Sequence, residues 1–177
     1  MGRDILVDGY NIIKNSASFR AVEKKNLASA RDALINLLVQ RYRHTPHRVI
    51  VVFDGDSAVE QMHHERRICI IYSRHNQTAD SVIARLAVEA RQAGREVEMY
   101  SNDREVQQAV AQQDGTIHSV NQLTSQLNAP SRDTARRIQH RQAVRRQYGL
   151  DPSFDPDDEP EYRLPPKGKK KSSRRHR

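Results

Sequence analysis

Four aspartates stand at the ends of apolar segments or at the start of an amphipathic one: Asp8, Asp54, Asp80 and Asp103. If the apolar segments are parallel strands, their carboxyl ends meet at one edge of a sheet, where open α/β sheets bind ligands. Four like charges gathered there repel one another unless a cation lies between them. Carboxylate oxygens are the ligands that Mg²⁺ and Mn²⁺ prefer. The pattern therefore predicts a divalent metal that polarises a phosphodiester and activates a water molecule.

Each aspartate also has a purely structural explanation. Asp8 and Asp54 are both followed by glycine, which is a common turn pair. Asp80 suits the first turn of a helix, where the helix dipole favours an anion. Asp103 is a suitable N-cap. The metal hypothesis depends on the convergence of all four side chains rather than on any one of them.

The segments around these aspartates alternate between apolar runs and helical periodicity. Apolar runs predict strands over residues 5–7, 49–53 and 68–72, and residues 97–100 and 116–120 are also predicted to be strands. Helical spacing predicts helices over residues 26–43, 79–92, 104–112 and 121–127. Continuous apolar runs indicate strands that are covered on both faces. The alternation favours an α/β fold with a largely parallel sheet and right-handed crossovers.

The excess positive charge lies near the C-terminus. The chain of 177 residues has 30 Lys and Arg against 22 Asp and Glu, a net charge of +8. Residues 1–130 carry 16 basic and 15 acidic side chains, whereas residues 131–177 carry 14 and 7. We expect a basic helical extension over residues 129–148. The charged residues 149–177 are predicted to be disordered, because they cannot bury enough apolar surface.

The basic tail favours binding to RNA through phosphate neutralisation and counterion release. A solvated tail that only aids solubility is the alternative. Tyr10 and Tyr72 are candidates for stacking on bases, and Tyr72 equally for core packing. The candidate RNA-binding residues of the tail are Arg132, Arg136, Arg137, Arg141, Arg145, Lys169, Lys170 and Lys171.

Other features narrow the class of protein. No stretch approaches the ~18–20 consecutive apolar residues of a membrane span, and no apolar signal-peptide core follows the first residues. The single cysteine, Cys69, forms no intramolecular disulfide. Neither G-x-G-x-x-G nor G-x-x-x-x-G-K-[ST] occurs, so neither phosphate-binding loop is present. We expect a soluble, cytoplasmic protein without a membrane partner.

Four short motifs occur in an order that resembles a known family. They are DGYN at 8–11, VVFDG at 51–55, TADSV at 78–82 and SNDR at 101–104. Together they resemble the YacP-like branch of the NYN domain, within the PIN-like nuclease superfamily. The resemblance covers about residues 3–128. It implies a PIN-like three-layer α/β/α fold with a mainly parallel central sheet, and a nuclease domain over residues 1–128.

The resemblance also implies an activity, which is metal-dependent cleavage of RNA. For the YacP-like branch it implies endonuclease action on mRNA associated with ribosomes. By matched position, Asp8 and Asp80 would hold the principal Mg²⁺ or Mn²⁺, Asp54 and Asp103 would complete the metal site, and Asn11 would orient the catalytic centre. The expected reaction is attack on single-stranded RNA by a metal-activated water, leaving 5′-phosphate and 3′-hydroxyl ends.

Two other functions remain open. Residues 54–57 have the form D-x-D-[ST], which is similar to the haloacid-dehalogenase phosphohydrolases. Asp54 would then be a phosphoryl-accepting nucleophile, and Asp8 would have no role. The other alternative is a non-catalytic RNA or ribosome adaptor that works through the basic tail. In that case, changes of the aspartates to asparagine would leave function intact, and deletion of the tail would abolish it.

Overall fold

The computed structural model describes residues 2–130 and 132–148. The chain divides into two compact units, Met1–Ala129 and Pro130–Arg177. The predicted disorder over residues 149–177, and with it Lys169, Lys170 and Lys171, lies outside the described residues.

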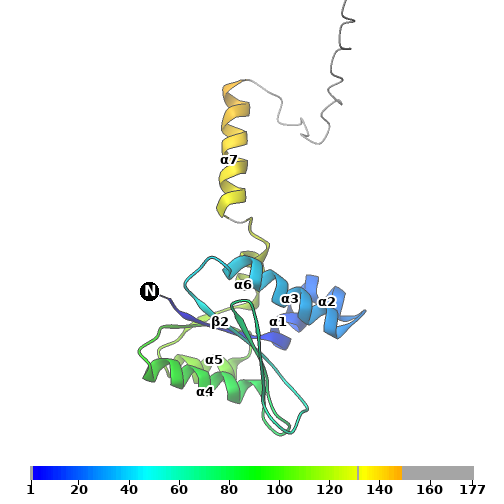
Figure 1. The fold of residues 1–177 in the computed structure, drawn as a ribbon, viewed down its shortest axis with the longest axis vertical. Coiled ribbons are helices and arrows are strands. Elements are labelled where there is room, and N and C mark those ends of the chain that lie inside the picture. Colours follow the sequence, from blue (N-terminus) through cyan, green and yellow to red (C-terminus); the bar gives the residue numbers. More distant parts are fainter. Residues whose placement is uncertain (1, 131, 149–177) are drawn as a thin grey trace, which may run out of the picture. The chain divides into compact units, whose positions relative to one another are not determined.

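A six-stranded sheet forms the centre of the first unit (Figure 1). In chain order its strands are β1 (Asp4–Asp8), β2 (Arg48–Phe53), β3 (Gln61–Glu65), β4 (Ile68–Tyr72), β5 (Val97–Tyr100) and β6 (Thr116–His118). Across the sheet the order is β3-β4-β2-β1-β5-β6. All neighbouring strands are parallel except β3 and β4. The predicted, mainly parallel sheet is confirmed.

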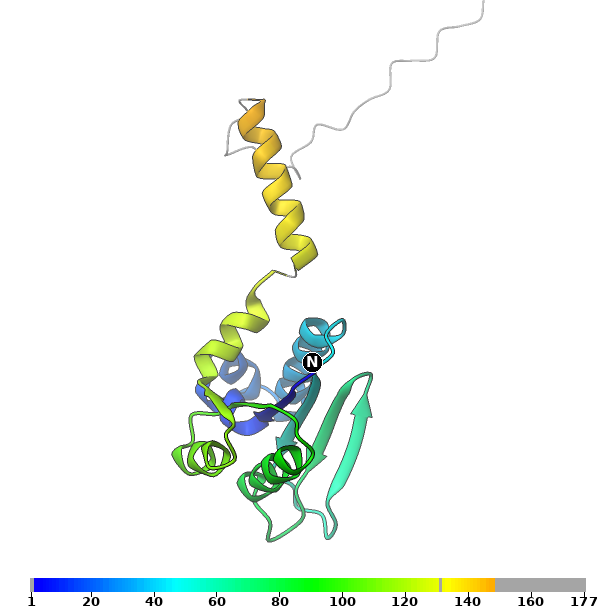
Figure 2. The ribbon, with the colours of Figure 1, turned by 90° about the vertical axis from the view of Figure 1, so that its left-hand side faces the viewer.

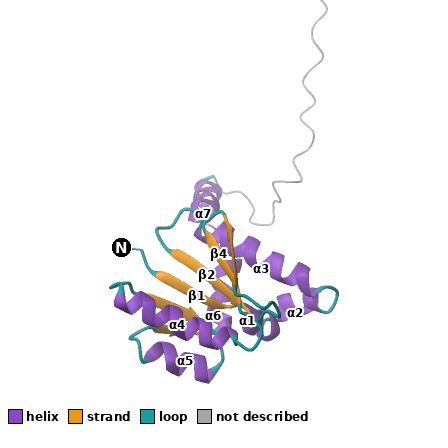
Figure 3. Cartoon of the chain, turned by 60° about the horizontal axis from the view of Figure 1, so that its bottom comes forward, coloured by secondary structure: helices purple, strands orange, loops and turns teal. Residues whose placement is uncertain are grey.

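Helices cover both faces of the sheet (Figures 2 and 3). One face carries α1 (Gly9–Asn15), α2 (Ala17–Glu23), α3 (Leu27–Tyr42) and α6 (Val120–Asn128). The other face carries α4 (Ala79–Gln92) and α5 (Arg104–Ala111). Successive strand residues point to opposite faces, so Ile5 and Val7 pack into the first layer and Leu6 into the second. The central strands β1 and β2 are buried on both sides, which explains the unbroken apolar sequences of residues 5–7 and 49–53. Helices on both faces of the sheet confirm the three-layer architecture.

The strand connections diverge between β1 and β5. β1 leads into helices on one face of the sheet, whereas β5 leads into α5 on the other face. Such a switch point leaves a crevice beyond the carboxyl ends of the two strands. The register pairs Val7 with Tyr100, so Asp8 and Ser101 leave the sheet next to each other. The fold therefore brings the DGYN and SNDR motifs together.

Three segments differ from the sequence predictions. Residues 9–23, for which no element was predicted, form α1 and α2. The polar sequence Gln61–Glu65 forms β3, an antiparallel edge strand whose five residues are all exposed. The last strand ends at His118 rather than at residue 120, because Ser119 and Gln122 form a capping box that starts α6.

The second unit contains α7 (Arg132–Gln147), which lies in the predicted basic extension. The side chains of Arg136, Arg137 and Arg141 are exposed. Within the residues that the structure describes, no helix is long and apolar enough to cross a bilayer.

Candidate active site

Asp8 is the last residue of β1 and the N-cap of α1. Its side chain is buried, with 6% of the residue exposed. Asn11 N–H donates to Oδ1 at 3.1 Å, and the Ser101 hydroxyl donates to Oδ2 at 3.0 Å. The pKa of Asp8 is raised from 3.8 to about 6, mainly by burial and also by the charges of Asp80 and Asp54, against the lowering effect of the two hydrogen bonds. The Asp8 carboxylate is thus held in a fixed orientation at this edge of the sheet, where burial and neighbouring acids destabilise its charged form.

Ser101 joins the two strand ends at the switch point. It is completely buried and follows β5. While its hydroxyl donates to Asp8, it also accepts a hydrogen bond from Asp103 N–H at 3.0 Å. Asp103 Oδ1 in turn caps α5 by accepting from Glu105 N–H at 2.8 Å. The serine therefore fixes the spacing between Asp8 and Asp103.

Asn11 positions the site through the backbone. Its side-chain oxygen accepts from Asn102 N–H at 2.8 Å, which connects α1 to the loop after β5. Asn102 Oδ1 accepts from Val120 N–H at 3.0 Å, which continues the connection to α6. The asparagine of the DGYN motif and the asparagine of the SNDR motif thus form one bridge across the crevice.

Asp54 follows β2 and connects that strand to α4. Its Oδ1 accepts from Ala79 N–H at 2.7 Å, so the start of α4 is held at the same sheet edge. The residue is exposed, and Oδ2 makes no hydrogen bond within the described part of the chain. This contact holds the start of α4 near the strand ends, so Asp80, which comes from a helix, interacts electrostatically with Asp8, Asp54 and Asp103.

The two glycines that follow the strand-end aspartates are required by close packing. A Cβ on Gly9 would lie 2.2 Å from the Phe53 ring, and a Cβ on Gly55 would lie 2.3 Å from the Ser73 carbonyl oxygen. Neither glycine has the positive φ that would demand glycine for conformational reasons. Their role is therefore to let α1 and the loop after β2 approach the sheet closely.

Asp80 is the aspartate with the fewest constraints. It lies in the first turn of α4 and is half-buried. Among the residues described by the structure, its carboxylate has no hydrogen-bond or ion-pair partner. Burial raises its pKa, as do the neighbouring charges of Asp103, Asp54 and Glu105. Its oxygens are available to an incoming cation.

The donor set fits a hard divalent cation. Within residues 2–130 and 132–148, none of the four aspartates is paired with a basic side chain. The charges of Asp80 and Asp54 raise the pKa of Asp8, and those of Asp103 and Asp54 raise the pKa of Asp80. No three acidic, His or Cys side chains in these residues are assembled as a ready-made ligand set. Mg²⁺ typically takes one or two protein carboxylates, keeps several waters and contacts substrate phosphate. The available oxygens on Asp54, Asp80 and Asp103 suit that mode.

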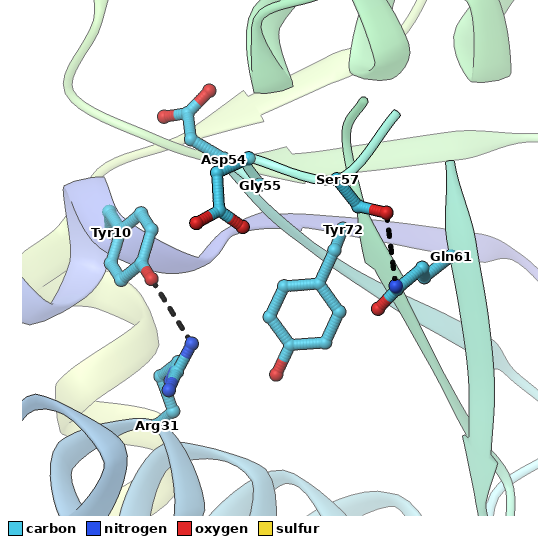
Figure 4. A pocket seen from close by; sticks show the side chains of 8 residues that line it. Tyr10, Arg31, Asp54, Gly55, Ser57, Gln61 and Tyr72 are labelled. Atoms are coloured by element: carbon cyan, nitrogen blue, oxygen red, sulfur yellow. Dashed lines mark hydrogen bonds between the residues drawn. The ribbon is translucent and has the colours of Figure 1, made fainter. Parts of the chain in front are cut away.

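A cavity of about 530 Å³ opens beside Asp54 (Figure 4). Its lining includes Tyr10 from α1, Arg31 from α3 and Tyr72 from β4. Figure 4 shows Asp54 beside the Tyr10, Tyr72 and Arg31 side chains that line this cavity. The acidic edge of the sheet therefore continues into a polar cavity that also contains a cationic side chain.

Sequence reasoning missed three residues of this region: Ser101, Ser73 and Arg31. Ser101 stands inside the SNDR motif, which was its only signal. Ser73 is completely buried, and its hydroxyl accepts from Gly55 N–H at 3.1 Å. Arg31 comes from a helix whose pattern indicates core packing, and it has no sequence signal.

Comparison with known proteins gives consistent results. The family described as the YacP-like NYN domain matches residues 5–159. The chain is 29% identical over 136 residues to the uncharacterized protein YacP of Bacillus subtilis strain 168, which covers 76% of this chain and 80% of that protein. It is similar to the crystal structure of Rae1 (YacP) from Bacillus subtilis, with a TM-score of 0.63 and 27% identity over 84% of both chains. A mutant of Rae1 gives a TM-score of 0.63 and 28% identity, covering 83% of this chain and 84% of that one.

Proposed function

The chain belongs to the YacP-like NYN domain family, a PIN-like nuclease family, and on this premise we propose that it is a metal-dependent endoribonuclease that cleaves single-stranded RNA. The observation that carries the proposal is the gathering of Asp8, Asp54, Asp80 and Asp103 at the switch point of the sheet, where their charges oppose one another. An electrostatic arrangement of this kind costs stability and is typical of a functional site.

In this proposal the four aspartates have unequal roles. Mg²⁺ or Mn²⁺, when bound, supplies Lewis acidity that lowers the pKa of a water and polarises the phosphodiester. Asp80 would hold the metal, and Asp54 and Asp103 would each offer the oxygen that is not used in fixing a helix start. Asp8 supplies buried negative charge, fixed by Asn11 N–H and Ser101. Asn11 keeps α1 and the loop after β5 at constant separation.

The products of cleavage test this chemistry. Attack by water on the phosphorus leaves a 5′-phosphate and a 3′-hydroxyl, whereas attack by the neighbouring 2′-hydroxyl leaves a 2′,3′-cyclic phosphate. We expect 5′-phosphate ends, so the fragments should become substrates for a 5′-phosphate-dependent exonuclease without prior kinase treatment. Cyclic phosphate ends would contradict the water mechanism.

We further propose that the basic tail supplies affinity for RNA. In this assignment the nuclease domain covers residues 1–128, the basic helical extension 129–148 and the charged tail 149–177. Exposed Arg136, Arg137 and Arg141 on α7 support it. Action on mRNA at the ribosome is the biological setting that we propose, from the resemblance to the YacP-like branch together with the basic tail, which would contact RNA phosphates there without selecting a sequence.

Removal of the chain after Pro130 should flatten the dependence of RNA affinity on salt. Each basic side chain that neutralises a phosphate of a single strand contributes about 0.7 to the slope of log affinity against log salt. We expect the slope to fall by several times this amount, measured by fluorescence anisotropy between low and moderate salt. The full chain carrying Asp80→Asn is the control, and its slope should match the wild type. An unchanged slope after truncation would remove the tail from RNA binding.

The alternatives make different predictions. A phosphohydrolase that uses Asp54 as nucleophile would turn over p-nitrophenyl phosphate, which the nuclease should not. A non-catalytic adaptor would retain its cellular function when Asp80 is changed to asparagine and lose it when the tail is removed. The nuclease proposal requires instead that the change of Asp80 to asparagine abolishes the cellular function.

A further inference from the structure

The cavity beside Asp54 holds an arginine without an acidic partner. Arg31 is half-buried on α3, and in the part of the chain described by the structure no Asp or Glu pairs with it. A guanidinium group has five N–H donors in a rigid fork. One of these groups, Nη1, donates to the Tyr10 hydroxyl at 3.3 Å. Most of its donor capacity is therefore open to a ligand.

Aromatic side chains hold Arg31 in a defined position. Its guanidinium carbon lies 5.7 Å from the centroid of the Tyr72 ring, within cation–π range. The Tyr72 ring stacks on Phe53 at 5.5 Å, and the Tyr10 ring meets Phe53 edge-on at 5.1 Å. Phe53 is completely buried, so these contacts extend to the core. An arginine fixed by uncharged partners loses little conformational entropy when it binds an anion.

Asp54 connects this arginine to the acidic site. Both side chains line the same cavity of about 530 Å³, within the ~300–1,000 Å³ typical of small-ligand sites. A polyanion that places one phosphate at the acidic edge, with its metal, can place a neighbouring phosphate against Arg31. Tyr10, Tyr72 and Gln61 also line this cavity, where the nucleoside between the two phosphates would lie.

We propose that this cavity is a nucleotide subsite, in which Arg31 binds the RNA phosphate next to the one that is cleaved. The inference rests on the proposed function, since it takes RNA as the substrate. Arg31 is thus a binding residue rather than a reacting one. The cavity accommodates a nucleotide turned out of a stack, which single-stranded RNA offers and a duplex does not. This subsite would make the domain selective for single strands, a property that the unselective tail does not supply.

The direct test is RNA binding by the full chain in EDTA, where cleavage is prevented. We expect Arg31→Gln to weaken the binding of a short single-stranded RNA about tenfold, the loss expected for a charge-assisted contact. Arg41→Gln is the matched control, because it removes the same charge from the same helix. Arg41 is exposed and lies about 15 Å further along the axis. Its change should alter affinity less than about twofold. The RNA affinity of Arg31→Lys should lie between those of Arg31→Gln and Arg41→Gln, since lysine keeps the positive charge but lacks the forked N–H donors of the guanidinium group.

A neutral methylphosphonate linkage, moved stepwise along the RNA, locates the contact. At one linkage beside the cut site, neutralisation should weaken wild-type binding about tenfold and leave Arg31→Gln unaffected, which is the signature of a direct pair in a double-mutant cycle. With Mg²⁺ present, Arg31→Gln should raise KM and leave kcat within about twofold. Thermal unfolding within a few degrees of the wild type confirms that the variant is folded.

The outcomes separate the two proposals. If the wild type cleaves RNA and Arg31→Gln behaves as Arg41→Gln does, the subsite is wrong and the nuclease stands. If kcat falls and KM does not change, Arg31 acts on the reacting phosphate, and the subsite is again wrong. If the wild type binds RNA with the predicted dependence on Arg31 but never cleaves it, the nuclease proposal fails and the subsite is supported.

Discussion

Replacement of Asp80 by asparagine is expected to lower the rate of RNA cleavage by about 10³-fold, which corresponds to several kcal/mol of lost transition-state stabilisation. Asp80 has no hydrogen bond or ion pair within the described residues, so its carboxylate has no structural contact to lose. Its substitution removes a metal ligand and leaves the N-cap of α4, Thr78, in place. The measurement is the single-turnover rate at saturating protein.

Asp32→Asn provides the matched control for Asp80→Asn. It removes one negative charge from an exposed helical position on α3, and we expect the rate to stay within about twofold of the wild type. RNA affinity in EDTA should not decrease for Asp80→Asn, because the change removes a negative charge that repels phosphate. A cleavage rate close to wild type for Asp80→Asn would mean that this residue has no part in the chemistry.

Replacement of Asp8 by asparagine should inactivate the protein and, without metal, make it more stable. The pKa of Asp8 is raised from 3.8 to about 6 by burial and by neighbouring acids. Between these values the folded protein binds more protons than the unfolded chain, so the free energy of unfolding falls as pH rises through this window and stays low above it. Asparagine removes this penalty and still caps α1 well. We expect a gain of about 2 kcal/mol at pH 8 in EDTA.

Urea unfolding across the pH range checks this expectation for Asp8. The gain should shrink as pH falls below about 6 and vanish near pH 4, where the wild-type carboxyl is protonated in both states. Added Mg²⁺ should stabilise the wild type more than the variant, because the buried charge of Asp8 favours the bound cation. A variant that is less stable than the wild type at pH 8 would show that the carboxylate contributes more as an N-cap and as a partner of Ser101 than it costs by burial.

Much of the fold could be predicted because its core elements have strong patterns. Helix α4 and strand β4 have the bounds that the sequence predicts, since the helix has one apolar face and the strand is a short apolar run. The edge strand β3 was not predicted, because all its residues are exposed and its pairing with β4 requires no apolar sequence pattern. Helices α1 and α2 were not predicted, because each has only seven residues, which is too short to show a clear helical periodicity of apolar residues.

The four aspartates of the candidate site could be proposed from the sequence, but the hydrogen bonds that connect them to other residues could not. The strand-end positions of Asp8 and Asp54 follow from local sequence, and so does the role of Asp103 as an N-cap, which coexists with the proposed metal role. Contacts between residues far apart in the chain could not be predicted: the Ser101 hydroxyl reaches Asp8 across 93 residues. Arg31 likewise acquires its setting only when α3 packs beside β4. Such residues belong to the site because the fold brings them close together, and a single sequence contains no pattern that reveals this proximity.

The most direct test of the central claim is the cleavage of end-labelled single-stranded RNA by the wild type, Asp80→Asn and Asp32→Asn, each in Mg²⁺, Mn²⁺ and EDTA. The four-aspartate site predicts cleavage by the wild type and Asp32→Asn with either metal, no cleavage in EDTA, and a rate for Asp80→Asn that is about 10³-fold lower. Cleavage that persists in EDTA, or that is equal for Asp80→Asn and Asp32→Asn, would contradict a metal-dependent nuclease centred on these carboxylates.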